Sequence, residues 1–268
     1  MKRIAVLLAL ATLLLSGCAG TKLVRTEVDK QHEFNVTLEQ VQNEGAVVSQ
    51  GYAHPYEVDL ADLKKLLGDL SYLEETGIVT KEQEKGEAFQ AGEVNRLAPA
   101  LKTALAKANA NQRVHFISYN LNKQLLFSNS RKTEGILFVD ANKRLNLAFN
   151  FVNQDRRPNE TSAMLPIFSE LDPLTISASK TPLTALPPYA QQQQLTGGAK
   201  APLWISVDMN QLQQAIVKEE AALPKLTDAA LRDDIKTKLK YLKELLEEDL
   251  ITEKNYNRKK MELLDKIQ

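Results

Sequence analysis

The feature that most constrains the fold is a change in the spacing of apolar residues near Arg113. Before this point, apolar residues recur at steps of three and four, which places them on one face of a helix. After it they alternate with their neighbours, as in a strand, and the alternation is cleanest over 144–152. Such alternation is typical of an antiparallel sheet with one covered face and one face in water. We therefore expect an α+β body in which an antiparallel sheet packs with helices.

Two helices are expected before this change. The first covers 58–75, where leucines recur at helical spacing, with Asp59 as the N-cap and Gly77 as the C-terminal cap. The second covers 93–109 but contains Pro99, and proline breaks the backbone ladder of a helix unless it lies in the first turn. We therefore expect the second helix to start late or to bend at the proline.

A β-hairpin is predicted from 135–139 and 144–152, which are joined by turn-forming residues. Further strands are expected at 174–179 and 203–208. The stretch between them, 181–202, holds several prolines, a run of glutamines and two adjacent glycines. We interpret it as a surface loop, and the alternative is a lid or a partner-binding flap over the sheet.

The C-terminal residues differ in composition from the body. A helix over 209–222 ends before Pro224, and from there the chain is dense in charges of both signs. Within 226–268, four apolar residues follow a heptad-like spacing: Ile235, Leu239, Leu242 and Leu246. The chain then turns, and Thr252 can cap a second helix. We therefore predict a C-terminal αα-hairpin with a small apolar seam.

This hairpin resembles the short C-terminal domain family known as SHOCT. The residues that carry the likeness are Leu239, Leu242, Leu245, Leu250, Ile251, Thr252, Tyr256, Lys260, Leu263 and Leu264. The family usually has glycine where this chain has Asp249, and glutamate where it has Asn255. The resemblance implies a small helical module that mediates association, and it implies no catalysis.

The first residues read as a signal peptide. Lys2 and Arg3 precede an apolar run, Ile4 to Leu15, which small residues follow. The alternative is a transmembrane anchor, but a helix that spans a bilayer needs about 20 apolar residues, and this run is shorter. Residues 1–17 are therefore expected to be removed from the mature chain.

The end of this segment, Leu15-Ser16-Gly17-Cys18, resembles the lipobox of bacterial lipoproteins. The resemblance implies cleavage between Gly17 and Cys18 and a covalent lipid on the Cys18 thiol, whereas the alternative is that Cys18 is an ordinary small residue. Ala19 follows it, and not the aspartate that tends to retain such proteins in the inner membrane. We expect an anchor in the inner leaflet of the outer membrane, with the protein facing the periplasm. Three parts should follow the signal peptide: a lipidated tether (18–35), the body (36–223) and the hairpin (226–268).

Little in the sequence points to chemistry. Cys18 is the only cysteine, which excludes a disulfide framework, and basic and acidic residues balance at 34 each, which gives no case for binding nucleic acid. None of the three histidines, His32, His54 and His115, has partners at metal-ligand spacing. We interpret His115 as an outward-facing strand residue. No catalytic residue, metal site or cofactor other than the lipid is therefore expected.

We expect a non-catalytic role in binding, assembly or scaffolding within the bacterial envelope. Residues 226–268 would contact a protein partner or a second copy of the chain. The alternative is a lipid-anchored enzyme or small-ligand binder. It would use a pocket in the body, between the sheet and the helices at 58–109, with His54, Tyr56 or His115 near it.

Overall fold

The structure is a computed structural model that describes residues 21–76, 82–120, 131–155, 166–184, 186–222, 228–247 and 253–264. The chain divides into two compact units, Met1–Ile216 and Val217–Gln268. Within the described ranges, no helix has both the length and the apolar character needed to cross a membrane. The signal peptide, Gly17 and Cys18 lie outside the described residues.

The first unit contains a large antiparallel sheet, a small one and the helices that pack on them. The strands of the large sheet are β1 (Lys22–Lys30), β2 (Phe34–Asn43), β3 (Ala46–Val47), β6 (Gln112–Asn120), β7 (Arg131–Val139), β8 (Leu145–Asp155), β10 (Ala190–Gln194) and β11 (Lys200–Val207). The small sheet consists of β4 (Ser71–Thr76), β5 (Glu82–Glu87) and β9 (Leu183–Thr184). The helices are α2 (Leu60–Asp69), α3 (Ala91–Lys107), the 3-10 helix η2 (Pro173–Thr175) and α4 (Met209–Ala222), whose last residues enter the second unit.

The large sheet has the order β1-β2-β6-β7-β8-β11-β10, with β3 paired to β2 beyond the start of β6. All of its strand pairs are antiparallel. The expected β7–β8 hairpin is present, and its turn runs through Asp140–Arg144, with Lys143 at a φ of 60°. The expected α+β class, an antiparallel sheet packed with helices, is therefore confirmed.

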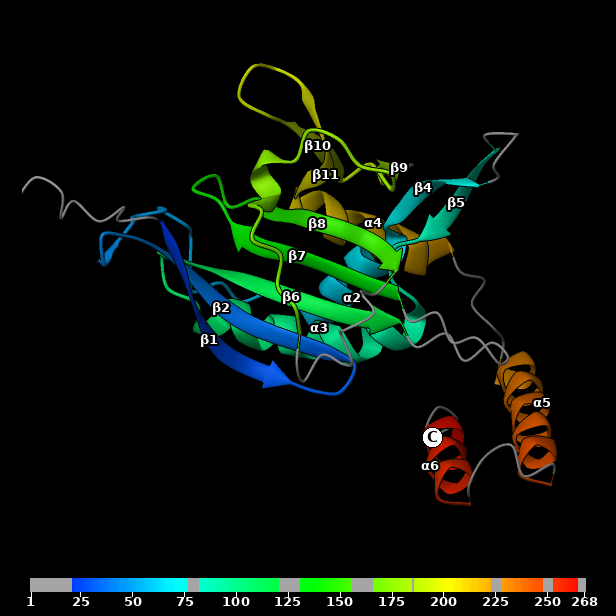
Figure 1. Cartoon of the computed structure of the whole chain (residues 1–268). Coiled ribbons are helices and arrows are strands. Elements are labelled where there is room, and N and C mark those ends of the chain that lie inside the picture. Colours follow the sequence, from blue (N-terminus) through cyan, green and yellow to red (C-terminus); the bar gives the residue numbers. More distant parts are fainter. Residues whose placement is uncertain are drawn as a thin grey trace, which may run out of the picture. The chain divides into compact units, whose positions relative to one another are not determined.

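The main apolar core lies between the large sheet and the helices. Figure 1 shows α2 and α3 on one side of the sheet. The buried residues on that side include Val36, Leu38, Val114, Phe116, Leu137, Leu147 and Phe149 of the sheet and Leu63, Leu66, Leu97, Leu101 and Leu105 of the helices. Each large side chain that is fully buried contributes about 1.5–3 kcal/mol. This burial fixes which face of each strand points toward the helices.

Helix α3 keeps Pro99 in its interior. The expected late start is wrong, because the helix begins at Ala91, where the Gln90 N–H donates to the Glu93 carboxylate at 3.0 Å. An interior proline costs about 3 kcal/mol. The proline is tolerated because its neighbours Leu97 and Leu101 are fully buried against the sheet.

Helix α2 is shorter than the expected 58–75. The Asp59 cap is confirmed, since its carboxylate accepts the Ala61 N–H at 2.7 Å. The helix ends at Asp69, because Ser71–Thr76 forms β4 between β5 and β9. Leu73 keeps the helical spacing by coincidence within that strand. The expected cap, Gly77, lies outside the described residues.

Three other expectations are corrected. The tether expected over 18–35 is strand from Lys22 to Lys30, because these residues form β1, which pairs with β2. The strand expected at 174–179 is replaced by the single turn η2. Much of the loop expected over 181–202 is strand, because β9 pairs with β4 and β10 pairs with β11.

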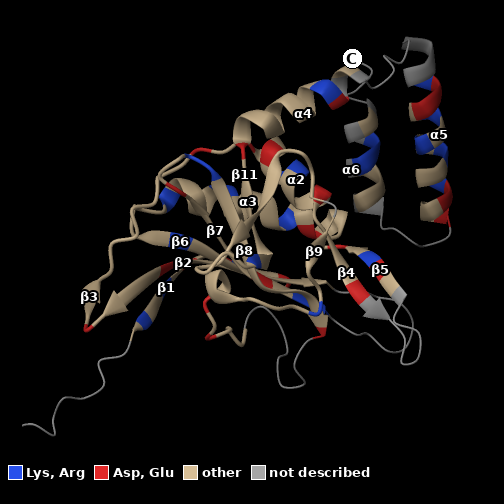
Figure 2. Cartoon of the chain, turned by 90° about the horizontal axis from the view of Figure 1, so that it is seen from above, with Lys and Arg blue, Asp and Glu red and all other residues tan. Residues whose placement is uncertain are grey.

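The second unit contains α5 (Asp228–Glu247) and α6 (Glu253–Leu264), which contact each other. Ile235 of the predicted seam is buried, and Leu239, Leu242 and Leu246 are half-buried. Figure 2 shows both acidic and basic residues on α5, and basic residues on the described part of α6. The connection between them, 248–252, lies outside the described residues, as does Thr252. The unit begins at Val217, earlier than the expected 226, because Leu212 is the last buried residue of α4 and Val217 is 64% exposed.

The Asp59 cap makes a testable contribution to the stability of the body. Replacing Asp59→Ala should lower the free energy of unfolding by about 1 kcal/mol, because one N–H at the start of α2 loses its acceptor. Asp59→Asn keeps an acceptor oxygen and should retain most of the stability. Urea unfolding followed by fluorescence of the single tryptophan, Trp204 in β11, measures both variants. Equal destabilisation by the two substitutions would contradict the capping role.

Candidate functional site

The second face of the large sheet is buried, although we expected one face in water. Seven polar side chains of β2, β6 and β7 on this face are almost fully excluded from solvent: Asn35, Thr37, Glu39, Arg113, His115, Lys132 and Glu134. Charged side chains are rarely fully buried unless they are paired. We call this set, together with Arg25 of β1 and Asp172, the charge network.

One half of the charge network is a row across three strands. Arg25 lies opposite Glu39, and Glu39 lies opposite Arg113, so the three side chains share one face. Each arginine has a nitrogen 2.6 Å from a Glu39 oxygen. Arg113 also pairs with Asp172 at 3.0 Å. A carboxylate between two guanidinium groups offsets the cost of burying all three charges.

The pKa of Arg113 follows from these neighbours. Burial lowers it, but the negative charges of Glu39 and Asp172 and the hydrogen bond to Glu39 together raise it above its ordinary value. These neighbours therefore favour the charged form of the Arg113 guanidinium.

The other half joins His115 of β6 to two residues of β7. His115 Nε2 lies 3.1 Å from Glu134 Oε1, and Lys132 Nζ lies 3.4 Å from Glu134 Oε2. His115 is only 2% exposed, so the outward-facing position that we expected for it is wrong. The residue does point away from the helices, but that side of the sheet is covered. A pairing of this kind is a diagonal cross-strand contact, because Ile117 and not His115 lies opposite Glu134.

Glu134 is held in its charged form. Burial raises its pKa, but the His115 hydrogen bond and charge, the Ser169 N–H and Lys132 outweigh burial, and the pKa falls below the ordinary 4.5. Glu93 behaves in the opposite way: burial raises its pKa, and the Ser118 hydroxyl, which donates to it at 2.6 Å, offsets only part of that rise.

A single segment, 166–172, lies over the charge network, and we call it the cover segment. Figure 1 shows it crossing the strands on the side of the sheet opposite α2 and α3. Its backbone is held by sheet side chains. Lys132 Nζ donates to the Ile167 carbonyl at 2.7 Å, and Glu134 accepts the Ser169 N–H at 2.8 Å.

Phe168 adds ring contacts to these bonds. The Arg25 guanidinium lies 4.5 Å from the Phe168 ring centroid, in cation–π geometry, and the His115 ring meets it edge-on at 5.4 Å. The charge network therefore uses its charges to hold the cover segment. A substrate reaches His115 or Glu134 only if that segment moves.

The other sequence-predicted residues have structural contacts. His54 Nε2 accepts the Val139 N–H at 3.2 Å, so its neutral ring carries the proton on Nδ1. Burial lowers the pKa of His54, which favours that neutral form. Burial also raises the pKa of the half-buried Tyr56. His32 is exposed in the turn between β1 and β2. The structure therefore does not join His54 and Tyr56 to His115 in one site.

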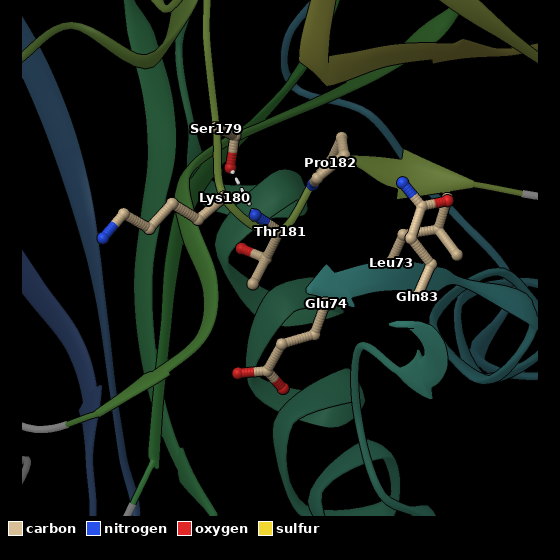
Figure 3. A pocket seen from close by; sticks show the side chains of 7 residues that line it. All are labelled: Leu73, Glu74, Gln83, Ser179, Lys180, Thr181 and Pro182. Atoms are coloured by element: carbon tan, nitrogen blue, oxygen red, sulfur yellow. Dashed lines mark hydrogen bonds between the residues drawn. The ribbon is translucent and has the colours of Figure 1, made fainter. Parts of the chain in front are cut away.

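A pocket of about 460 Å³ lies between the small sheet and the segment before β9. It is lined by Leu73, Glu74, Gln83, Ser179, Lys180, Thr181 and Pro182. Figure 3 shows the charged ends of Glu74 and Lys180 apart from each other, with no contact drawn between them. Glu74 is already paired with Arg131 at 2.8 Å, and Thr181 donates to the Val152 carbonyl at 3.0 Å. The polar groups of this pocket therefore do not converge on one point, and His54, Tyr56 and His115 are not among them.

Among the described residues, no group of three or more histidine, cysteine, aspartate or glutamate side chains is placed to hold a metal ion. The charge network itself was not predicted from the sequence. Local sequence contained no signal for it, because Arg113 follows the largely polar stretch 109–112, and Lys132 and Glu134 lie within the polar stretch 128–134. Their partners lie on other strands, so their burial depends on a register that one strand alone does not reveal.

Comparisons with known proteins add no further argument. No family model, no curated protein and no solved structure matches the chain. The likenesses to lipoprotein signal peptides and to SHOCT therefore stand on the residues that carry them. What the body does is inferred from its own geometry.

The lowered pKa of Glu134 predicts how stability depends on pH. Ionised Glu134 stabilises the folded state above its unfolded pKa, and this contribution disappears as the pH falls through the lower folded pKa. Glu134→Gln should therefore destabilise the body on the order of 2 kcal/mol at neutral pH, the size of a hydrogen bond to a charged group. The difference from the parent protein should shrink in acid.

Urea unfolding at a series of pH values measures this difference in the free energy of unfolding. Glu87→Gln is the matched control, because Glu87 is exposed on β5, and it should leave stability unchanged. A Glu134→Gln deficit that stays constant from neutral to acid pH would show that the ionised carboxylate is not what holds the cover segment.

Proposed function

We propose that this chain is a lipid-anchored protein of the bacterial envelope, held by Cys18 at the outer membrane and facing the periplasm. Its role is non-catalytic: it binds or assembles other envelope components through residues 226–268. Residues 1–18 support the anchor, because a basic start, a short apolar run and the Gly17-Cys18 pair occur in the order that lipidation requires. A single acyl chain binds a membrane only marginally, so stable attachment relies on the several chains that the lipoprotein resemblance implies.

The observation that carries the assembly role is the separate C-terminal unit. Its two described helices contact each other, and Leu239, Leu242 and Leu246 of the predicted apolar seam are only half-buried. Two helices with one seam bury too little apolar surface to be stable alone. Such a unit gains stability when a partner or a second copy completes the seam. Tyr241, 61% exposed on α5, adds an aromatic side chain to the surface of this unit.

The contacts of the buried charges in the body support the same non-catalytic role. Glu134, Lys132 and Arg113 each make a bond to the cover segment, Arg113 through the Asp172 carboxylate at its end. A catalytic acid or base has to touch its substrate, whereas these groups are buried and engaged. The charge network is therefore better explained as a structural device that closes the sheet.

The alternative is a small-ligand binder or an enzyme that uses the body. The 460 Å³ pocket beside Glu74 and Lys180 favours it, since its volume lies in the range of ligand pockets. The separation of the charged groups and the pairing of Glu74 with Arg131 argue against it, because ligand sites need polar groups that converge.

Site-specific photo-crosslinking in living bacteria separates these functions. A photoreactive amino acid replaces Tyr241 in α5 or, as the matched control, Leu171 in the cover segment, because both are large, apolar and exposed. The proposal predicts discrete crosslinked species from position 241 and none from position 171. Deletion of 226–268 should abolish partner capture by the rest of the chain.

Two results would count against assembly through the C-terminal unit. One is a chain that crosslinks only from position 171. The other is a deletion variant that captures the same partners in the same amounts as the intact chain. Saturable binding of a small molecule that Lys180→Ala abolishes would instead favour the pocket.

A further inference from the structure

We propose that the hairpin between β2 and β3, Asn43–Val47, rests on the lipid bilayer surface beside the anchor. The proposal extends the proposed function, because it depends on the lipid at Cys18. It assigns a membrane-facing corner to the body in place of the lipidated tether expected over 18–35.

The first step is the length of chain between the lipid and the sheet. Only four residue steps separate Cys18 from Lys22, the first residue of β1. A fully extended chain spans at most about 3.6 Å per residue, so Lys22 lies within about 14 Å of the lipid-bearing cysteine. A body attached this closely cannot turn freely, and the beginning of β1 has to stay near the bilayer.

The second step is the register of the sheet. Gln42 of β2 pairs with Lys22 on one side and with Val47 of β3 on the other. Neighbouring strands are about 4.8 Å apart, so Val47 lies about 10 Å from Lys22. Figure 2 shows β3 beside the beginning of β1. The short connection therefore brings this hairpin to the bilayer along with β1.

The third step is the surface that the hairpin presents. Val47 is one of the few large apolar side chains exposed on the described part of the body, at 45%, and Ala46 beside it is exposed as well. The two turn residues, Glu44 and Gly45, both have positive φ, 52° and 80°, as in the tight two-residue turns of hairpins. The hairpin is therefore a short, defined projection with an apolar side, and exposed Lys22 next to it suits the phosphate groups of lipids.

The opposite end of β1 provides an internal contrast. His32 is exposed in the turn between β1 and β2, ten residues after Lys22. A strand rises about 3.3 Å per residue, so His32 lies about 30 Å from the anchored end. The proposal requires the turn between β2 and β3 to lie closer to the membrane than the turn between β1 and β2.

Fluorescence quenching by labelled lipids tests this difference. Val47→Cys and His32→Cys each introduce one reactive thiol, because Cys18 is the only natural cysteine and its thiol would carry the lipid. Each lipidated full-length variant is labelled with an environment-sensitive fluorophore. It is then reconstituted into phosphatidylethanolamine–phosphatidylglycerol vesicles that contain lipids with a quencher on the headgroup.

The proposal predicts severalfold stronger quenching at position 47 than at position 32, and a blue-shifted emission at position 47 alone. Ala46→Cys should behave like Val47→Cys. Equal quenching at positions 47 and 32, in protein that remains on the vesicles, would overturn the membrane-facing hairpin and leave the anchor intact. The Cys18→Ser variant is expected not to stay on the vesicles. If the full-length chain that keeps Cys18 also fails to stay on them, both the anchor and the hairpin proposal are overturned.

Discussion

The body depends on the burial of both faces of its central sheet by two different kinds of contact. One face packs apolar residues such as Phe116 and Leu147 against α2 and α3. The other face pairs charges, and the row formed by Arg25, Glu39 and Arg113 exists because these residues are opposite one another on adjacent strands. A slip of one residue would turn the charges toward the helices and the apolar residues toward the cover segment. The charge network therefore adds specificity to a register that the apolar core already favours.

This arrangement leaves the centre of the body closed. Buried ion pairs stabilise little beyond the cost of their own desolvation, but losing one partner leaves the other charge unpaired. Lys132 and Glu134 bind the backbone of the cover segment, so the segment and the network depend on each other. The places left for interaction are at the periphery: the corner near the proposed anchor, the pocket beside β4 and the helices α5 and α6. This is the ground on which we propose binding and assembly as the role of the chain.

The sequence predicted those features that depend on neighbouring residues. The Asp59 cap, the hairpin of β7 and β8 and the position of α4 all follow from local patterns. Features that depend on distant strands were missed. The spacing of Leu73 predicted a helix, but its segment is a strand that pairs with β5 and β9. The glutamines of β10 predicted a loop, but they pair with β11. The polar residues of β1 predicted a tether, but they pair with β2. His115 and Glu134 were missed as a pair for the same reason, because their burial requires the sheet and the cover segment together.

The proposed function depends on the membrane location that a lipid on Cys18 would give to this body. Because β1 begins at Lys22, such an anchor would also determine which corner of the sheet meets the membrane. Mass spectrometry of the N-terminal peptide, isolated from bacterial membranes, tests this lipid attachment most directly. The account predicts a peptide that begins at Cys18 and carries the added mass of acyl chains. A peptide that retains residues 1–17, or one with an unmodified Cys18 thiol, would contradict it.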